Sequence, residues 1–290
     1  MDPLESPLTA VSDTPPGLDR SGTVVTPVVA NPNNPPWGVP GALTIWLSSI
    51  ALLAIIPIFT ALPYVILSQL PLTDALQKDK DFIFYSVLGM FPAHFLTLLI
   101  AWLIATRVGR YQFWRTLGWH WKNFGPWKSI FTAVFLLALG TVVTYYFGGP
   151  KTELEELISS SYRTRLTVAI LAATTAPLVE EVVYRGLLYA ALQRVIGVAG
   201  SIALVTIMFA AVHFWQYWPN FWVIAVICLL SLTLTVVRAY SGSLLQPYVI
   251  HLVFNGIQSV FLVVQPLFDK TEQSPEAMPA LILAALKYFH

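Results

Sequence analysis

Charged residues are scarce in this chain: Asp, Glu, Lys and Arg make up only 11% of its 290 residues. Soluble domains carry about 25%. Hydrophobic residues take up the difference and reach 56%. This composition is typical of a protein whose surface is solvated by lipid, because lipid-facing positions need no charge. The sequence therefore predicts a multi-pass protein of the cell membrane, with the lipid bilayer as a partner.

Cysteine is almost absent, and charge of either sign is not in excess. The single Cys228 excludes a disulfide framework and a cysteine-based metal site. The formal net charge of +1 provides no attraction to a polyanion, so we predict no nucleic-acid partner. The oligomeric state does not follow from the sequence.

Proline is concentrated at the N-terminus, where nine of the 21 prolines lie in residues 1–41. The rest of this segment is polar and small, and such a composition buries too little apolar surface to fold by itself. We therefore predict a Pro-rich, disordered or polyproline-like tail over 1–41 and a transmembrane helical domain over 42–290.

Long apolar segments recur through the rest of the chain. A spanning helix needs about 20 predominantly apolar residues. Seven segments approach or exceed this length, namely 43–70, 82–105, 130–147, 166–195, 199–215, 221–237 and 244–267. An eighth, 275–289, is barely long enough. The sequence thus predicts an all-α fold, a polytopic transmembrane helical bundle with seven or eight spans.

Three ionisable residues, Glu180, Glu181 and Arg185, interrupt the fourth apolar segment. Such groups are costly at bilayer depth and usually face a cavity or a partner. Glu181 and Arg185 are four residues apart, so they can pair on one helix face. Glu180 points roughly 100° away from Glu181, which leaves its carboxylate for another task. Tyr184, four residues after Glu180, can donate a hydrogen bond to it.

Polar residues also occur on two later apolar segments. His213 ends the motif that begins at Phe209, and His251 and Asn255 lie four residues apart. Polar side chains of facing membrane helices tend to converge, because lipid offers them no partners. Together with Glu180 these residues have the parts needed for hydrolysis: a general base, an acid, and donors for an oxyanion.

The ordered motifs Glu-Glu-x-x-x-Arg, Phe-x-x-x-His and His-x-x-x-Asn resemble those of the CAAX protease and bacteriocin-processing (CPBP, Abi) family. These are intramembrane endopeptidases related to the prenyl-protein protease Rce1. The resemblance covers about 172–258 and implies a catalytic core at about 166–268. It also implies a hydrolase that cleaves a peptide bond in a membrane-associated peptide or protein, with a lipidated substrate as one class.

The resemblance assigns roles as well. It makes Glu180 the base that activates water, as in a glutamic protease, and His213 the residue that helps to hold that water. It makes His251 and Asn255 the pair that stabilises the oxyanion.

In the same family pattern, Glu181 and Arg185 occupy supporting positions. The alternative is a purely structural ion cluster. That is a poor account, since buried ion pairs add little net stability over apolar residues.

Zinc is an alternative to a metal-free mechanism. Catalytic zinc takes three protein ligands, which Glu180, His213 and His251 could supply. However, the chain has no His-Glu-x-x-His motif, so we expect no cofactor.

Two non-proteolytic interpretations also stand: a membrane protein that binds or sequesters a peptide as an immunity or assembly factor, and a transporter with a proton-relay glutamate. The lack of internal repeats argues against the transporter.

Two further polar residues receive a structural interpretation. His94, in segment 82–105, has no polar companion nearby in the sequence. Arg238, at the end of segment 221–237, is expected to extend to the lipid headgroups.

Overall fold

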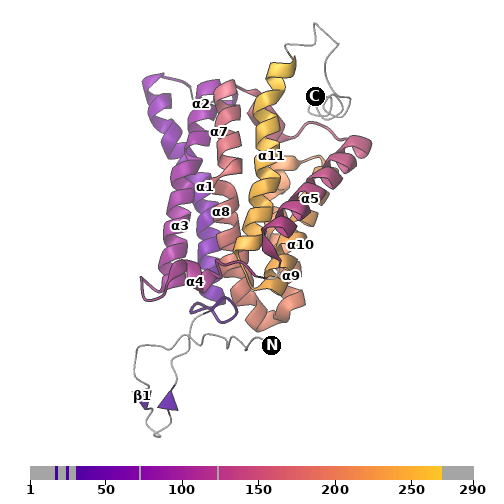
Figure 1. Ribbon diagram of the computed structural model, residues 1–290. Coiled ribbons are helices and arrows are strands. Elements are labelled where there is room, and N and C mark those ends of the chain that lie inside the picture. The colour runs from indigo at the N-terminus through magenta and orange to yellow at the C-terminus, as the bar shows by residue number, and fades with distance from the viewer. Residues whose placement is uncertain (1–16, 19–23, 26–30, 72, 123, 270–290) are drawn as a thin grey trace.

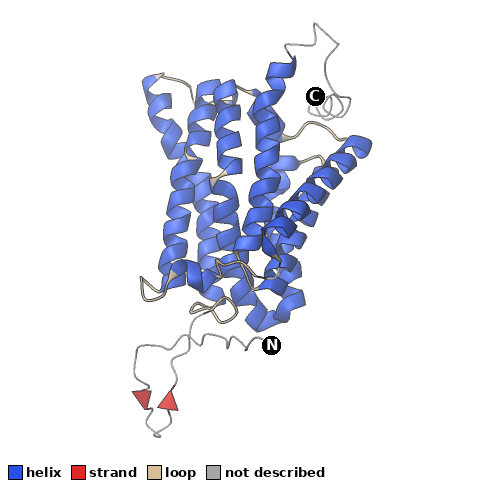
Figure 2. Ribbon diagram, viewed as in Figure 1, coloured by secondary structure: helices blue, strands red, loops and turns tan. Residues whose placement is uncertain are grey.

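The computed structural model describes residues 17–18, 24–25, 31–71, 73–122 and 124–269 (Figure 1). Nearly all of this part of the chain is helical (Figure 2). Two short strands, β1 (Gly17–Leu18) and β2 (Val24–Val25), pair in antiparallel fashion. Most of the predicted tail and the whole segment 275–289 lie outside the described residues.

The helices follow one another with short connections. The first half of the chain contains α1 (Val39–Leu67), the 3₁₀ helix η1 (Asp74–Lys78), α2 (Lys80–Leu88), α3 (Met90–Thr106), α4 (Phe113–Leu117) and α5 (Gly125–Phe147). The second half contains α6 (Glu153–Ser159), α7 (Tyr162–Ala173), α8 (Thr175–Glu180), the π-helix η2 (Glu181–Leu188), α9 (Tyr189–Tyr217), α10 (Phe221–Ser241) and α11 (Leu245–Asp269).

Six helical stretches of the described chain are long and apolar enough to cross a membrane. They are Val39–Leu67, Lys80–Thr106, Gly125–Phe147, Tyr162–Tyr217, Phe221–Ser241 and Leu245–Val264. At most 33% of the most apolar window of each stretch is buried inside the protein. Most apolar side chains therefore face outward, where a bilayer would solvate them. The prediction of an all-helical, multi-pass membrane protein is confirmed.

The predicted fourth and fifth spans form one stretch of 56 residues, Tyr162–Tyr217. A straight helix of this length would extend about 84 Å, far beyond a hydrocarbon core of about 30 Å. Gly197 interrupts it with φ 73° and ψ 175°, a combination open essentially only to glycine. The chain turns there, and α9 packs back against η2 (Figure 1). The described residues thus contain six candidate spans, one of them divided at Gly197, and the predicted count of seven or eight spans is not confirmed.

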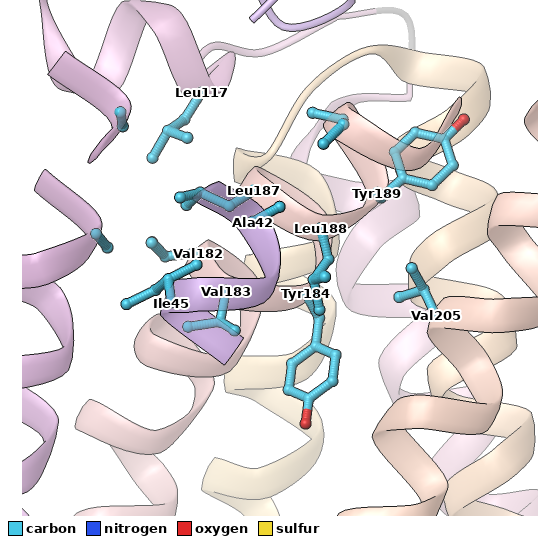
Figure 3. Close-up of a cluster of buried hydrophobic side chains, with 14 of the residues drawn as sticks. Ala42, Ile45, Leu117, Val182, Val183, Tyr184, Leu187, Leu188, Tyr189 and Val205 are labelled. Carbon is cyan, nitrogen blue, oxygen red and sulfur yellow. The ribbon is translucent and has the colours of Figure 1, made fainter. Parts of the chain in front are cut away.

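The main hydrophobic core surrounds η2, and all eight residues of this π-helix are buried. Figure 3 shows how side chains from distant parts of the chain meet there, among them Ile45 of α1, Leu117 of α4 and Val205 of α9. The ring of Tyr184 belongs to the same cluster, but its hydroxyl points out of it. A helix buried on every side needs an internal partner for each of its polar groups.

The segment before α1 closes one end of the bundle over η2. Trp37 Nε1 donates a hydrogen bond of 3.1 Å to the carbonyl of Leu187. Arg238 Nη2 donates one of 3.1 Å to the carbonyl of Pro32, and Arg238 Nε donates one of 3.2 Å to the carbonyl of Arg185.

The predicted headgroup position of Arg238 is therefore wrong. The side chain is 0% exposed, because α10 packs against η2 and directs the guanidinium to carbonyl oxygens inside the protein.

Candidate active site

A break in the helix sets the position of the two glutamates. The helix α7 ends at Ala173, and Thr174 has the non-helical angles φ −131° and ψ −77°. Pro177 explains the break, since it has no N–H for the carbonyl of Ala173 and its ring crowds that oxygen. The short helix α8 then begins at Thr175 and ends at Glu180.

The next residues form the π-helix η2, in which each N–H bonds to a carbonyl five residues earlier. Its end shows this spacing, because the N–H of Tyr189 donates to the carbonyl of Tyr184. π-Helical turns are rare and occur frequently at functional sites. Nothing in the sequence indicated this one, as apolar periodicity does not separate a π-helix from an α-helix over eight residues.

Glu181 and Arg185 form the expected ion pair, with 2.9 Å between Glu181 Oε1 and Arg185 Nη1. Both side chains are 0% exposed. The remaining guanidinium nitrogens are held by α10, where Arg185 Nη2 donates to Ser231 Oγ at 2.8 Å and Nε donates to Thr235 Oγ1 at 3.2 Å. The charge of Glu181 is thus compensated inside the protein.

His251 of α11 bridges the two carboxylates. Its Nδ1 lies 2.9 Å from Glu181 Oε1 and donates a hydrogen bond to it. Its Nε2 lies 3.6 Å from Glu180 Oε2. Because the first contact fixes the ring, the second nitrogen faces Glu180.

His213 of α9 is oriented in the same manner. Its Nδ1 donates a hydrogen bond of 2.8 Å to the carbonyl of Phe209, and its ring stacks on the Phe209 ring with 4.4 Å between centroids. The opposite nitrogen, Nε2, lies 3.8 Å from Glu180 Oε1. Each carboxylate oxygen of Glu180 therefore faces one imidazole, at a separation somewhat longer than a direct hydrogen bond.

The two glutamates differ sharply in access. The Glu180 side chain is 24% exposed, whereas that of Glu181 is 0% exposed. The side chain of His213 is also accessible, with 18% of its surface exposed. A molecule that enters the site meets Glu180 and His213 first.

Two other predicted participants have surroundings of a different kind. Asn255 lies one turn after His251 on α11 and is partly buried, and within the described residues its side chain makes no hydrogen bond with Glu180 or the site histidines. The predicted bond from Tyr184 to Glu180 is likewise not among those found there. Tyr184 Oη instead accepts a hydrogen bond of 3.2 Å from Trp46 Nε1 of α1.

His94 of α3 was not predicted to belong to the site. Its side chain is buried, and its Nδ1 lies 2.8 Å from Thr175 Oγ1 of α8. It is also close enough to Glu180 for an electrostatic interaction. Its place in the site could not be found from spacing in the sequence, because its partner lies 81 residues away. The signal that could have found it is the cost of an unpaired histidine inside an apolar span.

The described part of the chain contains no group of three or more His, Cys, Asp or Glu side chains arranged to hold a metal ion. Glu180, His213 and His251, the ligands expected for a zinc-dependent version, do lie together. Their arrangement can move a proton from a water molecule to a carboxylate, with two imidazoles to orient the participants.

Comparison with known proteins agrees with the resemblance. Residues 162–257 match the family model of the type II CAAX prenyl endopeptidases, Rce1-like. The matched segment runs from α7 into α11 and contains both glutamates, Arg185, both site histidines and Asn255. No similar protein was found among curated sequences or among solved structures.

Proposed function

We propose that this membrane protein is an intramembrane endopeptidase in which Glu180 activates the water that attacks the peptide bond. The observation that carries the proposal is the contrast between the two glutamates. Glu181 is fully buried and paired with Arg185, whereas Glu180 is 24% exposed and faces the Nε2 atoms of His213 and His251 at 3.8 and 3.6 Å. The match to a CAAX endopeptidase family over 162–257 supports the same reaction class.

In the proposed first step, a water molecule lies between Glu180 and His213. Glu180 takes its proton, and the resulting hydroxide oxygen bonds to the carbonyl carbon of the scissile peptide. His213 orients the water through Nε2, because its Nδ1 is already engaged with the carbonyl of Phe209. A positioned general base of this kind contributes about 10²- to 10⁴-fold to the rate.

In the second step the tetrahedral oxyanion is stabilised by His251 and Asn255. When doubly protonated, His251 keeps one N–H on Glu181 and presents the other at Nε2. The side-chain amide of Asn255 lies one turn further along α11 and supplies a second donor. Glu180 then transfers its proton to the leaving amine as the C–N bond breaks.

The substrate in this proposal is a peptide or protein that reaches Glu180 from the membrane, and prenylated CAAX proteins are one candidate class. No zinc is required, since the carboxylate supplies the base and His251 with Asn255 supplies the donors. Glu181 and Arg185 support the site by fixing the ring of His251.

The test is cleavage of a peptide library, with and without prenylated members, by the purified protein in detergent or liposomes. Glu180→Gln keeps the size of the side chain and removes the base, so we expect a loss of about 10²- to 10⁴-fold in kcat. Glu156→Gln, on the exposed surface of α6, is the matched control and should cleave like wild type.

Equal cleavage by wild type and Glu180→Gln would refute the proposed base. Binding of a peptide without cleavage by any variant would favour the sequestering protein, and proton-coupled uptake into liposomes would favour the transporter.

A further inference from the structure

A hydrogen bond joins α3 to the start of α8, the short helix that ends at the exposed glutamate. His94 is 6% exposed, and the hydrogen bond of 2.8 Å between its Nδ1 and Thr175 Oγ1 joins two helices that pack against each other. Burying an imidazole in an apolar span carries a desolvation cost. Such residues usually have a functional role.

The position of Thr175, the partner of His94, suggests that role. It is the first residue of α8, directly after the break at Thr174, and Glu180 is the last residue of the same six-residue helix. The break removes the backbone continuity that would otherwise hold α8 in line with α7. At its other end α8 continues without a break into the buried η2, so its start depends more on lateral contacts with α3 and α11.

We propose that His94 is a positioning residue of this site, which anchors the start of α8 through Thr175 and thereby holds Glu180 between His213 and His251. The inference rests on the proposed function, because it gives His94 a task in presenting the proposed base. His94 acts through its hydrogen bond to Thr175 and does not contact the substrate.

The geometry provides a matched pair of variants. The side-chain amide of Asn reaches about as far as Nδ1 of a histidine, whereas that of Gln reaches as far as Nε2. His94→Asn can therefore keep the bond to Thr175, and His94→Gln cannot form it in the same place. On the other partner, Thr175→Ser keeps the hydroxyl and Thr175→Val removes it with little change of shape.

Peptide cleavage gives the first measurement. We expect His94→Gln and Thr175→Val to lower kcat by about 10- to 100-fold with little change in KM, since small displacements of a catalytic group have effects of this size. His94→Asn and Thr175→Ser should retain activity close to wild type. The double variant His94→Gln/Thr175→Val should be no worse than either single variant, because both remove the same contact.

Hydrogen exchange of the protein in micelles gives a second measurement that needs no substrate. Peptides covering 174–181 should exchange faster in His94→Gln and Thr175→Val than in wild type, and peptides from α10 should not change. His94→Asn should match wild type.

The inference is overturned if Thr175→Val behaves like wild type in both measurements, or if His94→Asn is as impaired as His94→Gln. If the wild type cleaves no peptide, the proposed function loses its support, whereas the exchange data still decide whether His94 anchors α8.

Discussion

His251 Nδ1 lies 2.9 Å from Glu181 Oε1, and this single contact explains why two adjacent glutamates can have different tasks. The buried carboxylate of Glu181 is engaged inside the protein, where it contacts both Arg185 and the imidazole of His251. The ring so fixed directs its other nitrogen at Glu180. The buried carboxylate thus orients the site, and the accessible one is left to act on a substrate.

The first prediction concerns the buried carboxylate. Glu181→Gln leaves the guanidinium of Arg185 buried without a counter-charge, so we expect a destabilisation of about 3–5 kcal/mol. Glu180→Gln, on the accessible residue, should change stability by less than about 1 kcal/mol. Unfolding in mixed micelles measures both. Similar stabilities for the two variants would contradict the division of tasks between the glutamates.

A second prediction concerns the segment before α1. Trp37→Phe keeps most of the buried ring but leaves the carbonyl of Leu187 without its donor, which should cost about 1–3 kcal/mol. Trp127, which is 80% exposed, provides the control, and Trp127→Phe should be neutral. Thermal unfolding in detergent distinguishes them. If Trp37→Phe is also neutral, this segment does not help to hold η2.

The turn at Gly197 yields a third prediction. Its angles of φ 73° and ψ 175° are strained for any residue with a Cβ, so Gly197→Ala should destabilise the fold by about 1–3 kcal/mol. Gly256 lies inside α11, and an added Cβ there meets no atom within 4 Å. Gly256→Ala should therefore be neutral or slightly stabilising. Equal effects of the two substitutions on stability would contradict a turn at Gly197 between the helical segments on either side of it.

The fourth prediction concerns metal. If water is activated by Glu180 alone, dialysis against a strong zinc chelator should leave the cleavage rate unchanged. The measurement is the rate before dialysis, after it, and after zinc is added back. Loss of activity with recovery on zinc addition would replace the proposed mechanism by the zinc-dependent version, with Glu180, His213 and His251 as the ligands.

Local features of the site could be predicted well from the sequence. The pair formed by Glu181 and Arg185 follows from helical spacing alone, and the structure contains it. The apolar segments also predicted the spanning helices, because lipid requires long, continuous, hydrogen-bonded runs. The sequence was less informative over 166–215. Hydrophobicity predicted two apolar segments there, but it did not predict the turn at Gly197 that joins them.

Contacts between distant helices could not be predicted. His94 had no companion in the sequence, yet it meets Thr175 across the α3–α8 contact. Arg238 was expected at the headgroups, yet it is buried, with its Nε and Nη2 atoms donating to carbonyl oxygens. In both cases the partner is set by which helices are neighbours, and apolar periodicity says nothing about that.

By itself, the sequence determined that this is a multi-pass helical protein and which polar residues lie inside its spans. It also determined that Glu181 can pair with Arg185 while Glu180 points elsewhere. These properties depend on composition and on residues within one helical turn. Only the tertiary structure decided that His213 and His251 turn their Nε2 atoms to Glu180 and that η2 is a π-helix buried on all sides. Those properties depend on the packing of helices far apart in the chain, where each polar group takes whichever partner the fold brings within reach.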